Sequence, residues 1–380
     1  MSDAGPDGAV GRRSGGLYLR PLMTGAGTTS PRGGGRENQQ ETPGWHRPST
    51  PASTIGPWLP EGELGATLAA GLARVEAALT EAVASDHSFV SEAAGHLMAA
   101  GGKRFRPMLA VLAAQLGDGA VPQVVDAAVV CELTHLATLY HDDVMDEASV
   151  RRGAPSANSR WTNSVAILTG DFLFARASDL LADLGPEAVR VQAQTFERLV
   201  TGQLRETVGA QPGEDRVDHY LGVLADKTGS LVATSARFGA TFAGVPAELV
   251  TALTAFGEEV GVAFQLSDDL LDIVSEDGAS GKLPGTDLRE GIATLPVLFA
   301  LAGDDPAEAR LRELVAGPVV DDAEHAEALA LLRSSASLAR ATAVVEQYAD
   351  RARARLQAVP AGPVRDALSA LCTYVVTRTS

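Results

Sequence analysis

Two acidic pentads with the same spacing are the residues of this chain best suited to chemistry. The first is DDVMD, from Asp142 to Asp146, and the second is DDLLD, from Asp268 to Asp272. Their outer aspartates are four residues apart, which in a helix places them on one face with Cβ atoms about 5–6 Å apart. Each pentad follows an apolar stretch with helical spacing. Each is therefore predicted at the C-terminal end of a helix.

Carboxylates in this arrangement need a cation. Like charges four residues apart destabilise a helix, and the negative end of the helix dipole adds to the cost. Mg²⁺ fits because it prefers carboxylate oxygens and completes its shell with water and phosphate oxygens. Zn²⁺ would require His or Cys, and the sequence has neither HExxH nor CxxC. One pentad alone could be a solvated acidic cap, but two copies favour metal binding.

Two basic segments are suited to phosphate. In GGKRFRP the glycines can end one helix and Pro107 can lie in the first turn of the next. Lys103 and Arg106 would then lie beside a helix N-terminus, which attracts anions. Arg151 and Arg152 follow the first pentad and are suited to bidentate phosphate contact, although they could also simply balance its charge.

Helices must position these groups, because apolar residues recur every three or four positions from residue 61 onward. No alternating strand pattern competes, so we predict a single all-α domain over residues 59–380, built as a large helical bundle with a central apolar cavity. Residues 1–58 are rich in Gly, Pro, Ser and Thr, and we expect them to be a disordered extension. The expected apolar helical stretches are 61–79, 121–140, 164–182, 190–208, 218–243, 247–274, 306–315, 322–357 and 362–377.

Composition excludes several classes of function. The formal charge of −17 argues against nucleic-acid binding and against attraction to anionic lipid. Cys131 and Cys372 lie in apolar helical patterns and are expected to be core thiols without a disulfide. No signal peptide or apolar run of membrane-spanning length is apparent. We therefore expect a cytoplasmic protein with no stable membrane insertion.

The order of the motifs resembles a trans-isoprenyl diphosphate synthase of the polyprenyl synthetase family. The resemblance covers roughly residues 62–378. It rests on GGKRFRP, HLATLYHDDVMDEASVRRG, DKTGSL, FQLSDDLLD and GKLPGTDLREGIATLP, in that order. Such an enzyme joins isopentenyl diphosphate to an allylic diphosphate, and the family resemblance also suggests a homodimer.

The resemblance implies a role for each motif. Asp142 and Asp146 would bind Mg²⁺ bridging the allylic diphosphate, while Asp268, supported by Asp272, would hold a further ion, making three. The residues implied to hold isopentenyl diphosphate are Lys103, Arg106, His135 and Arg152.

The allylic side is assigned in the same way. Arg151 and Lys227 would contact the allylic diphosphate, and Thr228 and Gln265 would line the reacting centre. Lys282 is retained from the late motif, but Ile292 stands where many relatives carry a lysine, so that phosphate contact is in doubt.

Small residues before the first pentad bear on product length. Ala137 and Thr138 stand where short-product relatives commonly carry a bulky aromatic, and the pentad lacks the insertion of many bacterial farnesyl-type enzymes. Both features indicate a long product, about C30 to C50, and the GTDLREG variant resembles actinobacterial quinone side-chain synthases. The alternatives are a short-chain (C15 or C20) synthase and a subunit of a heteromeric synthase. A class I terpene cyclase, a squalene-type synthase and a helical scaffold agree less well with the intact basic and acidic motifs.

Overall fold

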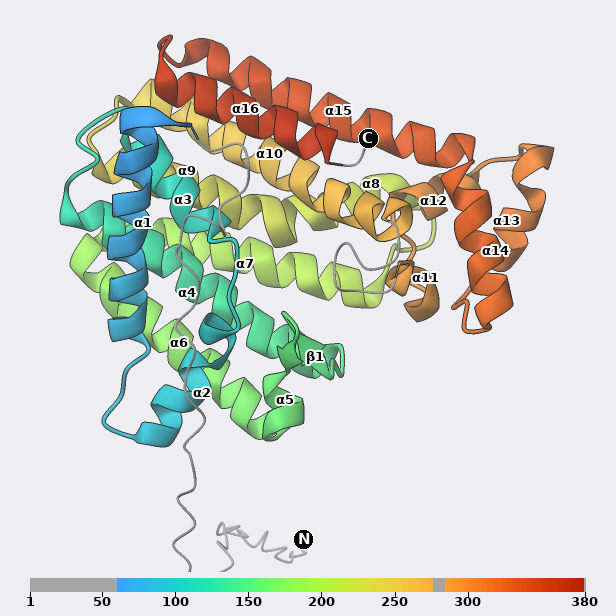
Figure 1. Ribbon diagram of the computed structural model, residues 1–380, viewed down its shortest axis with the longest axis horizontal. Helices are drawn as coiled ribbons and strands as arrows, with labels where there is room; N and C mark the ends of the chain where they lie inside the picture. The colour runs from blue at the N-terminus through green and yellow to red at the C-terminus, as the bar shows by residue number, and fades with distance from the viewer. Residues whose placement is uncertain (1–59, 276–283, 379–380) are drawn as a thin grey trace, which may run out of the picture. The chain divides into compact units, whose positions relative to one another are not determined.

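Helices form almost all the regular structure in the computed structural model, which describes residues 60–275 and 284–378 (Figure 1). The all-α prediction is confirmed for these residues, whereas the expected disordered extension, residues 1–58, lies outside them. The helices are α1 (Gly62–Ala82), α2 (Ser88–Ala99), α3 (Phe105–Ala114), α4 (Pro122–Met145), α5 (Ala157–Arg160), α6 (Asn163–Leu184), α7 (Pro186–Val208), α8 (Arg216–Leu224), α9 (Ser230–Phe242), α10 (Ala247–Val274), α11 (Thr286–Glu290), α12 (Leu295–Ala302), α13 (Ala309–Leu314), α14 (Asp322–Arg333), α15 (Ala336–Arg355) and α16 (Pro363–Thr377).

The two pentads lie at the C-terminal ends of long helices, as predicted. α4 carries the first pentad and packs against α1, α3, α6 and α9. α10 carries the second and packs against α9, α15 and α16. Because α9 contacts both, it joins the helix of one pentad to the helix of the other.

Two long helical stretches are interrupted where the sequence predicted continuity. Residues 218–243 form α8, a π-helical segment (Ala225–Gly229) and α9. Residues 322–357 are split into α14 and α15, which are bent by 58° relative to each other. The break follows from Ser335, whose hydroxyl accepts a hydrogen bond from the N–H of Leu338 and caps a new helix.

The described chain also contains a short hairpin that the sequence analysis did not anticipate. β1 (Val150–Arg151) pairs in antiparallel register with β2 (Ala154–Pro155). The two turn residues, Arg152 and Gly153, have φ of 54° and 75°. Positive φ at both central positions is characteristic of a type I′ turn, which suits a two-residue hairpin. The Arg-Arg-Gly motif is thus held in a defined turn.

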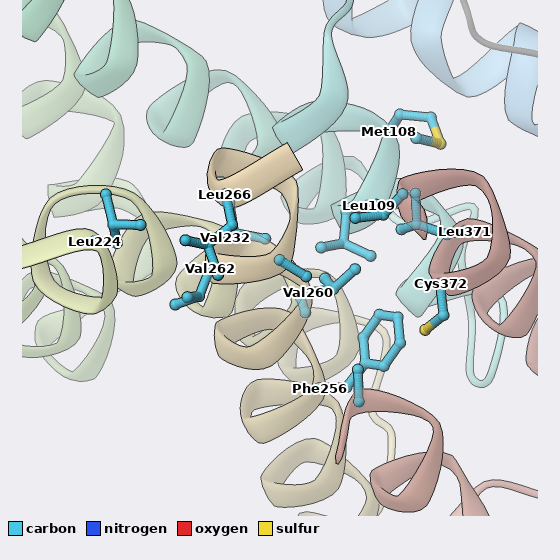
Figure 2. Close-up of a cluster of buried hydrophobic side chains, with 14 of the residues drawn as sticks. Met108, Leu109, Leu224, Val232, Phe256, Val260, Val262, Leu266, Leu371 and Cys372 are labelled. Carbon is cyan, nitrogen blue, oxygen red and sulfur yellow. The ribbon is translucent and has the colours of Figure 1, made fainter. Parts of the chain in front are cut away.

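Leu, Val and Ala side chains from α1, α3, α4, α9, α10 and α16 form the main core. Figure 2 shows part of it, where Leu109 of α3, Phe256 and Val260 of α10, and Cys372 of α16 come together. Both cysteines are buried free thiols, as expected.

α10 corrects the expectation that no helix would be apolar enough to span a membrane. By length and composition alone, α10 could cross a membrane, and so could α14 and α15 if the bent pair is taken as one span. However, 44% of the apolar window of α10 is buried inside the protein. Because α10 packs against α9 and α15, its buried apolar residues form part of the core.

Small residues set the distance between the core helices. A Cβ at Gly239 of α9 would lie 2.0 Å from the carbonyl oxygen of Ala110 in α3. We predict that Gly239→Ala lowers the free energy of unfolding by about 1–3 kcal/mol, because the helices would have to separate. Urea denaturation measures this. Gly95→Ala in α2, where a Cβ meets nothing within 4 Å, is the matched control and should not destabilise. Equal stability of the two variants would contradict the close approach.

Candidate active site

The last turn of α4 presents the first pentad. The middle aspartate, Asp143, is fully buried, and its Oδ1 accepts a hydrogen bond from Arg151 Nε at 2.6 Å. Arg151 also approaches the more exposed Asp146, with 3.9 Å between Nη2 and Oδ2. The sequence analysis gave Asp143 no role. In the structure it positions the first arginine of the hairpin.

Asp142 lies in a different environment from its neighbours. Its pKa is raised to about 6, chiefly by burial and also by the charge of Asp146, although the positive charges of Lys227 and Arg151 act to lower it. The electrostatic influence of Lys227 on Asp142, 85 residues earlier in the sequence, places the π-helical segment close to the first pentad. A partly buried carboxylate with a raised pKa is a site that gains from a divalent cation.

The second pentad receives its cation from the C-terminal end of the described chain. Arg378 Nη1 lies 2.8 Å from Asp268 Oδ1. The guanidinium also donates to the hydroxyl of Ser267 and stacks 4.1 Å above the ring of Phe264. Sequence reasoning missed Arg378 because a single arginine in a terminal helix forms no motif.

Asp272 has a backbone partner. Its Oδ2 accepts a hydrogen bond from the N–H of Asp287 at 3.2 Å, at the start of α11. Its main-chain carbonyl accepts from Gly285 at 2.7 Å. Asp272 therefore ties the end of α10 to α11. Lys282 falls outside the described residues.

Lys227 and Thr228 lie in the π-helical segment, which α7 approaches closely. A Cβ at Gly202 of α7 would be 2.7 Å from the backbone nitrogen of Lys227. Lys227 Nζ forms an ion pair with Glu206 of α7 at 2.5 Å. Thr228 Oγ1 donates to Gln265 Oε1 of α10 at 3.4 Å. Single π-helical turns are frequent at functional sites, and this one places Lys227, predicted to contact the allylic diphosphate, beside Thr228 and Gln265, predicted to line the reacting centre.

A basic cluster lies beside α4, formed by Arg104, Arg106, His135 and Arg152. Burial lowers the pKa of Arg106 and of Arg152, and Arg104 and Arg151 each lower that of Arg152 further. Arg106 Nε has no hydrogen-bond partner in the described part of the chain. One buried carboxylate, Glu132, faces these cations. Positive charge therefore exceeds negative charge here, and an anion would offset it.

The members of this cluster have distinct roles. Arg104 forms ion pairs with Glu76 and with Glu132, the latter at 3.2 Å, and so joins α1, α3 and α4. Arg152 Nη1 donates to the carbonyl oxygens of Leu97 and Gly101, which fixes the hairpin against the glycine turn. Arg106 is left with an unused donor. Sequence reasoning missed Glu132 because it lies within an apolar stripe.

Lys103, next to Arg104 in the sequence, lies close to α10, the helix that carries the second pentad. Its Nζ lies 5.5 Å from the centre of the Phe264 ring, which also contacts Arg378. Ile292, at the position of the missing lysine, is 49% exposed and offers no charge. The predicted residues within the described part therefore gather around α4, the π-helical segment and the end of α10.

No three His, Cys, Asp or Glu side chains form a ready-made metal cage in residues 60–275 and 284–378. The aspartates instead stand on two separate helix ends, with basic groups close to each. Mg²⁺ characteristically uses one or two carboxylates together with phosphate oxygens and water. The donor set therefore fits a metal ion held jointly with a phosphate-bearing ligand.

Comparison with known proteins gives one consistent result. A family model described as polyprenyl synthetase matches residues 87–332. The nonaprenyl diphosphate synthase of Mycobacterium tuberculosis is 53% identical over 333 residues, which make up 87% of this chain and 99% of that protein.

Solved structures agree with the sequence comparison. The geranylgeranyl pyrophosphate synthase of Corynebacterium glutamicum, complexed with calcium and isoprenyl diphosphate, has a TM-score of 0.77 at 46% identity, covering 84% of this chain and 99% of that one. The decaprenyl diphosphate synthase of Rhodobacter capsulatus has a TM-score of 0.75 at 36% identity, covering 82% and 97%.

The electrostatics of the basic cluster predict an unusual titration of His135. Burial, Arg106 and Arg152 hold its pKa well below the ordinary value of 6.5. The imidazole is therefore expected to stay neutral below pH 6.5 and to gain a proton more readily when inorganic diphosphate adds negative charge. The unfolded chain takes up this proton near pH 6.5, so stability contributed by this site falls as pH drops below that value. NMR of histidine-labelled protein, with exposed His87 as reference in the same spectra, measures the titration. A His135 already protonated at pH 6.5 without diphosphate would contradict the described surroundings.

Proposed function

We propose, from the premise that this chain belongs to the polyprenyl synthetase family, that it condenses isopentenyl diphosphate with an allylic diphosphate to make a long all-trans polyprenyl diphosphate. The observation that carries the proposal is the placement of two aspartate pentads on separate helix ends beside a cation-rich cluster with an unused arginine donor. The length of the product is supported by the similarity to nonaprenyl and decaprenyl diphosphate synthases.

Mg²⁺ is the cofactor that the acidic groups fit. Asp142 and Asp146 would hold ions on one side of the allylic diphosphate, and Asp268, supported by Asp272, would hold a third on the other. When bound, the ions supply electrostatic stabilisation of the diphosphate as it leaves. The calcium and isoprenyl diphosphate in the Corynebacterium glutamicum structure support a site shared by metal and diphosphate.

The basic residues bind the two diphosphates. Arg106 has a free donor, and together with Lys103, His135 and Arg152 it would hold isopentenyl diphosphate. Arg151, oriented by Asp143, and Lys227, oriented by Glu206, would contact the allylic diphosphate. Two separate anion sites hold the two substrates together, which lowers the entropy cost of their reaction.

The reaction follows from these positions. The allylic C–O bond breaks and its electron pair leaves with the diphosphate, whose growing charge Arg151 and Lys227 offset. Thr228 and Gln265 present oxygen atoms to the allylic cation. The isopentenyl double bond then forms the new C–C bond, and loss of a proton to the released diphosphate restores the alkene. Apolar helix walls exclude water that would quench the cation.

An exposed apolar surface supports a homodimer. Large apolar side chains at helical spacing lie on the outer faces of α6 and α7, where Leu168 is 66% exposed and Leu204 60%. The rings of Phe174 and Phe196, 4.6 Å apart, join the two helices. Exposed apolar side chains on two neighbouring helices suit a self-complementary two-fold interface. Its most exposed members are Ile167, Leu168, Val189, Val200, Leu204 and Val208.

A cytoplasmic location is proposed on two grounds. Both substrates carry charged diphosphates and are water-soluble. In addition, the apolar window of α10 is substantially buried in the protein core.

Removal of the outer aspartates tests the metal assignment. We predict that Asp142→Ala and Asp268→Ala each lower turnover of labelled isopentenyl diphosphate by at least about 100-fold, because the leaving diphosphate loses its electrostatic support. Asp366→Ala, an exposed aspartate in the first turn of α16, is the control and should keep near-normal turnover. Near-normal activity in either test variant would remove that residue from the metal site.

The residues before the first pentad are proposed to line an apolar tunnel that holds the growing chain. Thr138 is half-buried and lies one turn before Asp142 on the same face, whereas Ala137 is fully buried. We predict that Thr138→Phe shortens the product by several isoprene units without abolishing turnover, and that Ala137→Phe also shortens it, because a ring would block the growing chain. Chromatography of the products gives the distribution, with exposed Thr251→Phe as control. An unchanged distribution in both test variants would contradict the tunnel assignment.

A further inference from the structure

Gln265 is held in a chain of hydrogen bonds that reaches across three helical segments. Its Nε2 donates to Asp269 Oδ1 at 3.0 Å, one turn further along α10. The other oxygen of Asp269 accepts a hydrogen bond from the hydroxyl of Tyr220 in α8. On the opposite side, Thr228 of the π-helical segment donates to Gln265 Oε1.

We propose that Tyr220 and Asp269 are positioning residues that fix the orientation of the Gln265 amide, so that its carbonyl oxygen faces Thr228 and the carbon that becomes cationic. This inference rests on the function proposed above. It concerns Tyr220 and Asp269, two residues to which the sequence analysis gave no role.

The direction of each hydrogen bond follows from the groups involved. Gln265 Nε2 lies 3.0 Å from an acceptor oxygen of Asp269, and Gln265 Oε1 accepts from the Thr228 hydroxyl, so the NH₂ group faces Asp269 and the carbonyl oxygen faces Thr228. The backbone N–H of Leu295 is hydrogen-bonded to the Tyr220 hydroxyl, which leaves that hydroxyl to donate its own proton to Asp269. Burial and the adjacent charge of Asp269 raise the pKa of Tyr220 well above 10.0, so the proton stays on the phenol.

Both oxygens of Asp269 are therefore used within the protein. The middle aspartate of the first pentad also supports a side chain, because Asp143 Oδ1 orients Arg151, although Asp143 Oδ2 has no hydrogen-bond partner among the described residues. In each pentad the second aspartate thus supports a neighbouring side chain, while the outer aspartates are the ones proposed to bind metal.

The orientation of the amide matters for the reaction. With Nε2 held by Asp269, the negative end of the amide dipole points toward Thr228 and the site of positive charge. A flipped amide would present N–H groups to the cation and repel it. Because the charge develops only in the transition state, loss of this orientation lowers kcat and leaves substrate KM values unchanged.

A double-mutant cycle tests the proposal. Tyr220→Phe removes one hydroxyl, and Gln265→Met removes the amide while keeping a similar shape. We expect Tyr220→Phe to lower kcat about tenfold, the effect of one lost hydrogen bond, with KM for both substrates within about twofold of the parent. In the Gln265→Met background the same change should alter kcat by less than about twofold, because Tyr220 acts only through Gln265. Tyr348→Phe in α15 is the matched control.

A second measurement does not depend on turnover. In protein labelled with ¹⁵N-glutamine, Gln265→Met identifies the side-chain NH₂ signal of Gln265. Tyr220→Phe should shift that signal, and Tyr348→Phe should leave it in place. Thermal denaturation of each variant confirms that it is folded.

The outcomes are distinct. An unchanged Gln265 signal in Tyr220→Phe, an unchanged kcat, or an equal loss of kcat in both backgrounds would overturn the positioning role. A parent protein that is folded but makes no product would instead overturn the proposed function, and with it the reaction on which this inference rests.

Discussion

Negative charge gathered at the ends of two helices must be offset for this fold to be stable. α4 and α10 each end in three aspartates, where the helix dipole already disfavours negative charge. The protein offsets this charge with cations from other segments: Arg151 from the hairpin that follows the first pentad, Lys227 from the π-helical segment and Arg378 from the end of α16. Each of these cations comes from a segment that interrupts or ends a helix.

The basic cluster beside α4 has the opposite imbalance, an excess of positive charge. Arg104, Arg106 and Arg152 share one buried carboxylate, Glu132, and burial together with their charge lowers the pKa of His135. Arg104 uses its donors in ion pairs that join helices, whereas Arg106 Nε has no hydrogen-bond partner in the described part of the chain. The protein therefore separates a site that needs cations from a site that needs an anion. In the proposed function, metal ions and two diphosphates would together meet both needs.

The sequence predicted the helical architecture and the positions of the pentads well, because helical spacing and Asp-rich motifs are local signals. It did not predict the π-helical segment, since apolar spacing continues through it. The hairpin was missed because strands of two residues give no alternating pattern. Arg378 and Tyr220 come close to the site only through tertiary packing. Because each is a single residue outside the motifs, the sequence gives no signal of its role.

The second aspartate of each pentad illustrates the same limit. In the sequence, the aspartates of DDxxD look equivalent. In the structure, Asp143 and Asp269 differ from their neighbours in the side chains that donate hydrogen bonds to them. We propose that these groups together make a long-chain prenyltransferase. Purified full-length protein can be incubated with Mg²⁺, labelled isopentenyl diphosphate and farnesyl or geranylgeranyl diphosphate, and the products separated by chromatography. We expect a ladder of products that ends between about C30 and C50 and requires Mg²⁺. A product that stops at C15 or C20 would contradict the long-chain assignment, and no incorporation by folded protein would contradict the catalytic one.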